Sequence, residues 1–168
     1  KYGKVVSISA TASSGYSFSK WTVVSGNTPA STTSASTSVT ITQATTLRAD
    51  SNGGNSYTIA FTMNGAASKS STTVKYDTDV TIPNPTKTYT VNITNSAAGT
   101  LSASSASSTQ TFAGWTASGL DTGTSVHGTT TSPATAWNGT TKVTSKYFKN
   151  LRTASGTVTL TATWTPVA

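Results

Sequence analysis

The chain has 168 residues, of which 34% are hydrophobic, and a formal net charge of +7. The charge reflects scarce acid, four Asp and no Glu, and the 11 Lys and Arg residues are scattered, so we expect no nucleic-acid binding. The absence of Cys excludes disulfides and thiolate metal sites. No apolar run approaches the ~18 residues needed to span a bilayer, so we expect no transmembrane segment.

The first third of the chain alternates short strand patterns with turn signals. A loop is expected over residues 25–37, where small polar residues follow Ser-Gly-Asn-Thr-Pro. Residues 50–55 (Asp-Ser-Asn-Gly-Gly-Asn) are the clearest linker signal in the chain. We therefore predict two domains, 1–52 and 53–168. The strands predicted in the first domain from period-two alternation are 4–12, 39–41 and 47–49.

The second domain shows the same alternation over longer stretches. Asn64-Gly65 is expected as a tight turn, and residues 96–109 as a hairpin or loop. Residues 117–140 form a long Gly/Thr/Ser/Pro insertion. The only helical turn is expected at 145–151, because Phe148 and Leu151 are three residues apart. The strands predicted here are 57–63, 74–76, 80–82, 89–93 and 157–165.

Two short phrases occur twice, in the same order. Gly15-Tyr16-Ser17-Phe18-Ser19-Lys20-Trp21-Thr22 corresponds to Gln110-Thr111-Phe112-Ala113-Gly114-Trp115-Thr116, and Thr45-Thr46-Leu47-Arg48-Ala49 to Val158-Thr159-Leu160-Thr161-Ala162-Thr163-Trp164. In a regular strand, residues three apart would point to opposite faces. The Phe-x-x-Trp spacing therefore predicts either a β-bulge or an element covered on both faces.

These phrases resemble the internalin B-repeat family, also called Listeria–Bacteroides repeats. Residues 1–52 resemble the divergent form, and 53–168 resemble the commoner form through Tyr57-Thr58-Ile59-Ala60-Phe61, Ile82-Pro83-Asn84-Pro85-Thr86-Lys87, Phe112-Ala113-Gly114-Trp115 and Phe148-Lys149-Asn150-Leu151. The resemblance implies a mainly β chain with little or no helix, built of two tandem β-grasp-like modules. It also implies large secreted or surface-attached bacterial proteins, in which such modules act as stalk, spacer or adhesion units. The first module lacks the expected opening strand, which leaves its truncation open, and insertions including 117–140 enlarge the second.

Catalytic chemistry has few candidates. The chain holds one His and four Asp, and no Gly-x-Ser-x-Gly elbow. His127 is expected to be an exposed loop imidazole rather than a catalytic base. Asp77 and Asp79 are interpreted as a turn pair, since a hard cation needs six or more oxygen ligands. We therefore predict no catalytic residue, no metal site and no cofactor.

The aromatic residues divide into a repeated set and a remainder. The predicted structural core of the repeats is Tyr16, Phe18, Trp21, Leu47, Phe61, Phe112, Trp115, Leu160 and Trp164. Trp137 belongs to neither repeat and lies in the long insertion. Either it packs in a satellite cluster under the loop, or it contacts a ligand together with Tyr147.

The leading hypothesis is a non-catalytic structural or adhesive repeat segment of a bacterial cell-surface or secreted protein. Its partners would be other modules of the same polypeptide, with a host or surface glycan or protein as a further possibility. The chain starts at Lys1 and its single Met is Met63, so we interpret it as a piece of a longer polypeptide. The alternative is a carbohydrate-binding module that uses an exposed Trp137. A Lys–Asn cross-link also remains open.

Overall fold

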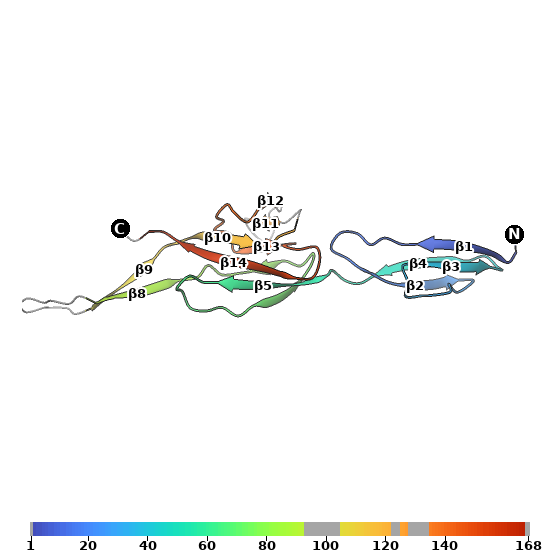
Figure 1. Cartoon of the computed structure of the whole chain (residues 1–168), viewed down its shortest axis with the longest axis horizontal. Helices are drawn as coiled ribbons and strands as arrows, with labels where there is room; N and C mark the ends of the chain where they lie inside the picture. Colours follow the sequence, from blue (N-terminus) through green and yellow to red (C-terminus); the bar gives the residue numbers. More distant parts are fainter. Residues whose placement is uncertain (1, 93–104, 122–124, 128–134, 167–168) are drawn as a thin grey trace, which may run out of the picture.

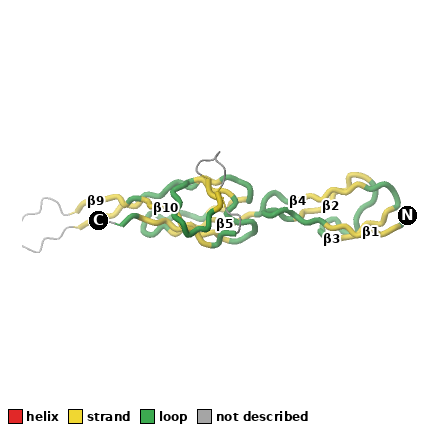
Figure 2. Tube along the Cα trace, turned by 90° about the horizontal axis from the view of Figure 1, so that it is seen from above, coloured by secondary structure: helices red, strands yellow, loops and turns green. Residues whose placement is uncertain are grey.

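The computed structural model describes residues 2–92, 105–121, 125–127 and 135–166. These residues form short strands, β1 to β14, arranged in five small sheets (Figure 1). No helix occurs among them, which confirms the prediction of a mainly β protein. Figure 2 shows the same strands, joined by loops that make up much of the remaining chain.

The first four strands form two antiparallel pairs. They are β1 (Lys4–Ser9), β2 (Phe18–Ser25), β3 (Ser36–Ile41) and β4 (Thr46–Ser51), with β1 on β3 and β2 on β4. Trp21 of β2 and Val39 of β3 are the buried apolar side chains of this group. The loop predicted at 25–37 connects β2 to β3, and Ser25 and the start of β3 belong to strands.

The main sheet of the second group has the order β10-β14-β5-β6. Its strands are β5 (Ser56–Thr62), β6 (Thr72–Lys75), β10 (Phe112–Ser118) and β14 (Thr157–Trp164). β5 and β14 are parallel at the centre, and each has its own antiparallel partner outside. The β-grasp-like assignment stays a prediction, because that fold also carries a helix and the residues described here form only strands and loops.

The remaining strands form a second sheet and a projecting pair. The second sheet has the order β12-β11-β13-β7, from β7 (Val80–Thr81), β11 (Ser125–His127), β12 (Thr135–Ala136) and β13 (Tyr147–Lys149). β8 (Lys87–Asn92) and β9 (Ser105–Gln110) form an antiparallel pair that extends away from the body of the molecule (Figure 1). The pairing agrees with the hairpin alternative for residues 96–109, of which 96–104 lie outside the described residues.

The core of the second group lies between its two larger sheets. β14 contributes Val158, Leu160 and Ala162, all fully buried, while its alternate Thr side chains are only partly buried or exposed. One buried face and one wetter face is the pattern that the alternation predicts. The rest of this core consists of Tyr57, Ile59, Val74, Ile82, Trp115, Trp137, Phe148 and Leu151.

Two sequence expectations need correction. The helical turn at 145–151 is wrong, because Tyr147–Lys149 is a strand whose backbone pairs with both β11 and β7. The insertion at 117–140 is not a plain loop in its described part, since it contains β11 and β12. Residues 122–124 and 128–134 of the insertion lie outside the described residues.

The two groups of strands lie end to end along the long axis of the molecule (Figure 1). The start of β1 and the end of β14 lie toward opposite ends of the molecule, and the segment between β4 and β5 connects the groups. The strands of the first group pair only with one another within the described residues. The domain division at 52 and 53 stays a prediction.

Candidate functional site in the two bulged strand pairs and their junction

The two repeated phrases are the two partners of one antiparallel pair, formed twice. Trp21 on β2 lies opposite Ala49 on β4, and Trp115 on β10 lies opposite Ala162 on β14. Likewise Val23 is opposite Leu47, and Ala117 is opposite Leu160. The register is therefore the same in both copies.

Both pairs carry a β-bulge between the Phe and the Trp. The register shifts between Phe18 and Lys20 in the first copy and between Phe112 and Gly114 in the second. An extra residue on one strand restores the parity that a spacing of three would break. The ring centroids are consequently close, 5.6 Å apart for Phe18–Trp21 and 5.2 Å for Phe112–Trp115. The bulge alternative is confirmed.

The two copies differ in the hydrogen bonds that their Trp residues make. In the first copy, Trp21 Nε1 donates to the Ser34 carbonyl at 2.9 Å, and its backbone N donates to Thr32 O at 2.7 Å. In the second copy, the Trp115 backbone N donates to Val143 O at 2.8 Å. Trp115 Nε1, however, is buried without a hydrogen-bond partner among the described residues.

Burial also separates the copies. Trp115, Leu160 and Ala162 are 0% exposed, whereas Trp21 is 9% exposed and Ala49 is exposed to solvent. The second copy is covered because β5 runs along β14 and brings Phe61 to within 6.0 Å of the Trp115 ring centroid. Within the described ranges, β4 pairs with β2 alone, so the first copy lacks a strand in this place.

Aromatic and basic side chains cover the outer part of the second copy. Phe112 lies 5.8 Å from Trp164, with the rings edge to face. Lys87 Nζ is 5.6 Å from the Trp164 ring centroid, and Lys69 Nζ is 5.2 Å from that of Phe61. Such cation–π contacts stabilise partly exposed aromatics modestly and shield their faces.

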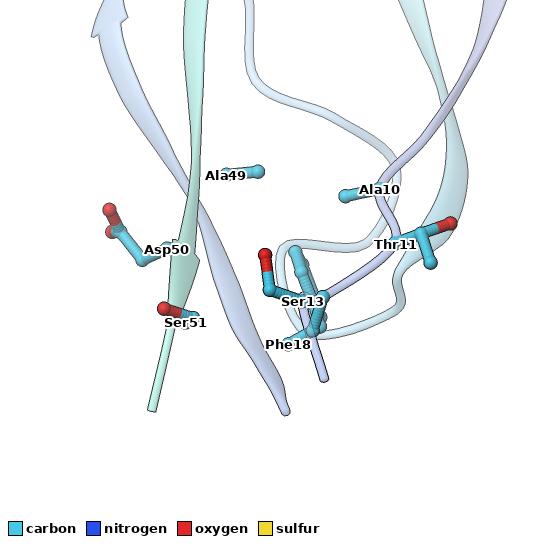
Figure 3. A pocket seen from close by; sticks show the side chains of 8 residues that line it. Ala10, Thr11, Ser13, Phe18, Ala49, Asp50 and Ser51 are labelled. Carbon is cyan, nitrogen blue, oxygen red and sulfur yellow. The ribbon is translucent and has the colours of Figure 1, made fainter. Parts of the chain in front are cut away.

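A small cavity of about 200 Å³ opens beside the uncovered strand of the first copy. Figure 3 shows Ala49 on β4 and Ala10, which follows β1, facing each other across it, with Phe18 at one side. Asp50, also at its rim, receives hydrogen bonds from Arg48 Nε (2.6 Å) and from Thr22, and these bonds lower its pKa. A carboxylate held ionised in this way is a poor general base. The other residues that line the cavity are Ala10, Thr11, Ala12, Ser13, Phe18, Ala49 and Ser51.

The junction between the two groups of strands is formed by backbone contacts. The Asn55 backbone N donates to Gly15 O at 2.7 Å, and Tyr76 N donates to Asn55 O at 2.8 Å. Gly15 has φ +83°, and a Cβ placed on it would lie 2.2 Å from the Tyr76 ring. Only glycine therefore fits at this approach of the two groups. The Tyr16 and Tyr76 rings meet edge to face, 5.8 Å apart.

A charged contact adjoins these backbone bonds. Lys149 Nζ lies 2.9 Å from Asp77 Oδ1, and the Tyr16 hydroxyl donates to Asp77 Oδ2 at 3.3 Å. Bonding to Lys149 is the main cause that lowers the pKa of Asp77, and the same bond raises the pKa of Lys149. Asp77 thus takes part in a contact at the junction. Among the described residues, no group of three or more His, Cys, Asp or Glu side chains could hold a metal ion.

The ligand-contact candidates lie elsewhere. Trp137 is 7% exposed; its Nε1 donates to Thr141 O at 2.8 Å and its ring centroid lies 5.9 Å from that of Phe148. It thus packs in the main core rather than in a satellite cluster, and the exposed ring that the carbohydrate hypothesis requires is not present. Tyr147 is half-buried, with Lys146 Nζ 5.5 Å from its ring centroid. His127 belongs to strand β11, opposite Tyr147, and its side chain lies outside the described residues.

Apart from Leu160, which is 0% exposed, the other members of the predicted repeat core are less buried than Trp21 and Trp115. Tyr16, Phe18, Leu47, Phe61, Phe112 and Trp164 are all half-buried. Sequence reasoning missed the junction residues Asn55 and Tyr76. Asn55 lies in the linker signal, where nothing distinguishes a side chain that bonds Ser17 Oγ and Thr153 O from an ordinary turn residue.

A duplicated bulged pair of short strands defines a small β repeat module. Residues 1–52 match the family model of the divergent InlB B-repeat domain, as the resemblance of this segment suggested. Domains of this repeat family are typically non-catalytic and are found in bacterial surface or secreted proteins. No curated protein and no solved structure gives a significant match to the chain. In the described part, no helix has the length and apolar character to cross a membrane.

Proposed function

We propose that the chain is a non-catalytic structural segment of a larger bacterial secreted or cell-surface protein, in which it acts as a spacer between other modules. Residues 1–52 and 53–168 would be two successive B-repeat-like modules. The observation that carries the proposal is the end-to-end arrangement of two bulged strand pairs, joined by the contacts of Gly15, Asn55 and Tyr76 (Figure 1).

The junction supports a stiff spacer rather than two modules on a flexible tether. The segment between β4 and β5 is short, and its Asn55 bonds to residues on both sides. Gly15 lies close against the Tyr76 ring, and Asn55 bonds to the backbone of both residues, so a change of angle between the groups has to disrupt these contacts. A spacer that holds its neighbours apart needs this kind of fixed angle.

The exposed apolar residues support a contact with another module of the same polypeptide. Tyr2, Val5 and Val24 are 86%, 60% and 61% exposed; Val5 and Val24 lie on β1 and β2, and Tyr2 precedes β1. An adjacent module would cover such residues at moderate affinity, since inter-domain contacts within a chain are commonly small and partly polar.

Small-angle X-ray scattering of the whole chain tests the spacer. We expect an elongated particle whose maximum dimension does not change between low and high salt. A compact particle, or one whose distribution of interatomic distances broadens with salt, would contradict the spacer proposal.

A glycan array tests the adhesive alternative. Specific glycan binding that is abolished by Tyr147→Ala but retained by Tyr89→Ala would point to a carbohydrate site.

A further inference from the structure

We infer that the parallel pair of β5 and β14 is the mechanical clamp of this molecule, and that the first group of strands yields to tension before it. The inference deepens the proposed function, because a spacer on a surface protein transmits the force that pulls on its neighbours. It follows from the order and direction of the strands, which fix how the force crosses each part.

Tension along the polypeptide reaches the second group at the start of β5 and leaves it at the end of β14. The two strands are hydrogen-bonded neighbours and run parallel, in register from Thr58 opposite Thr157 to Thr62 opposite Thr161. Pulling on opposite ends of parallel neighbours slides one strand along the other. All five paired positions are then loaded together, so several hydrogen bonds must break in one event.

Side chains reinforce this pair. Ile59 on β5 and its neighbour Val158 on β14 are 0% exposed, as is Leu160 beside Phe61. Asn64 Nδ2 donates to Ala162 O at 2.8 Å, and Trp164 Nε1 donates to Met63 O at 3.3 Å. Two side-chain bonds therefore close the pair at its far end, and the face that carries Ile59, Val158 and Leu160 is excluded from water.

The first group lacks an equivalent. Tension enters at β1 and leaves at β4, but β1 pairs with β3 and β4 with β2, and no described position pairs β1 with β4. The force must cross from one two-stranded sheet to the other, through contacts such as those of Trp21 with Thr32 and Ser34. These contacts are few and Trp21 is incompletely buried, so we expect this group to open first.

Single-molecule force spectroscopy on the whole chain tests the inference, and the absence of native Cys allows unique attachment points. Pulling from Tyr2→Cys and Pro166→Cys should give two events, a weak one from residues 4–51 and a strong one from 56–164. The second should release roughly twice the contour length of the first, at ~3.5 Å per residue.

The matched control changes only the direction of pulling. With attachment at Ala67→Cys and Pro166→Cys, the force acts on the same ends of β5 and β14 and peels them apart one bond at a time. We expect the rupture force of the second group to fall about threefold, because a few bonds rather than five paired positions resist at once. Equal forces in the two geometries would overturn the clamp.

A pair of Val→Ala variants separates mechanical from equilibrium stability. Val158 lies on β14 within the clamp, whereas Val74 lies on β6, outside the path of the force, and both are buried. Both variants should lower stability toward denaturant similarly, but only Val158→Ala should lower the rupture force. The inference would be overturned if both variants lowered the rupture force equally, or if the second group unfolded at a lower force than the first. Neither result would affect the elongated shape on which the spacer proposal depends.

Discussion

The two copies of the bulged pair share two short motifs, the register and the bulge, yet a neighbouring strand covers the second copy and not the first. In the second, Trp115, Leu160 and Ala162 are fully buried, whereas Ala49, the counterpart of Ala162, is exposed. The difference arises outside the pair, because β5 lies along β14 and no described strand lies along the matching edge of β4. Local sequence therefore sets the pairing, and a distant strand determines how much of it is buried.

The same comparison explains the charges on β4. Arg48 and Asp50 form an ion pair at 2.6 Å on the strand whose edge is open, while the matching residues of β14 are Thr. Charged side chains on an unpaired edge discourage other chains from adding a strand. The covered strand β14 needs no such protection and carries Thr, which packs well on a pleated surface.

The largest expected effect comes from truncating the central indoles. Trp115→Ala should lower the free energy of unfolding of the second group by ~3–5 kcal/mol, because a buried ring is lost and leaves a cavity. Trp21→Ala should cost about half as much, since the first copy is less completely covered. Urea unfolding followed by NMR signals from each group measures both. Equal losses would show that β5 does not account for the difference between the copies.

The junction gives the next largest effect. Gly15→Ala combines a positive-φ penalty of ~1–2 kcal/mol with overlap against Tyr76, about 1–3 kcal/mol more. Gly3→Ala is the matched control, because Gly3 has φ +77° and nothing within 4 Å of its Cβ position. Residual dipolar couplings should show the two groups reorienting independently in Gly15→Ala but not in Gly3→Ala. Fixed relative orientation in both variants would contradict a junction set by Gly15.

Replacing each Trp by Phe isolates the indole N–H. Trp21→Phe loses the hydrogen bond to Ser34 O, whereas Trp115→Phe removes a buried donor that has no described partner. A cavity from the smaller ring accompanies both changes and scales with the Trp→Ala loss at each site. As a fraction of that Trp→Ala loss, the Trp115→Phe loss in chemical denaturation should be the smaller, because only Trp21→Phe gives up a hydrogen bond of about 1 kcal/mol. The opposite order would indicate that Trp115 Nε1 is satisfied.

The smallest effect is the dependence of the junction on acid. The pKa of Asp77 is lowered from its ordinary 3.8, chiefly by Lys149, so its contribution is fully present above that value. It is lost as the pH falls through the lowered pKa. Chemical shifts of the Tyr16 ring should report a weakened junction in that range. Asp77→Asn should remove this dependence, and Asp50→Asn, which alters an acid within the first group, should leave it in place.

Sequence patterns predicted many of the strands and gave the bulge as one of two alternatives, because both are properties of a few neighbouring residues. Alternation identified 157–165, and the spacing of Phe18 and Trp21 required a change of parity. The same reasoning failed at 145–151, where the spacing of Phe148 and Leu151 suggested a helical turn. Backbone pairing of Phe148 with β11 and β7 overrides that local preference, and three-residue strands are too short to show alternation.

The candidate site was harder to predict because it depends on distant partners. The burial of Trp137 follows from contacts with Thr141 O and Phe148, which the composition of the insertion does not reveal. The open edge of β4 follows from the positions of other strands, and the Thr-Leu-x-Ala motif that β4 shares with the covered β14 does not reveal it. Asn55 looked like a linker residue, although its side chain bonds both groups of strands.

Because Trp115 is fully buried, and its indole N–H has no hydrogen-bond partner among the described residues, this ring is a probe of whether the second group is intact. An indole sealed from water emits at short wavelength, and its ring proton exchanges with deuterium only when the surrounding sheet opens. Trp21, partly open to solvent, offers no equally protected probe. Separation of β5 from β14 can therefore be followed by hydrogen exchange at the Trp115 indole and by a shift of Trp fluorescence to longer wavelength.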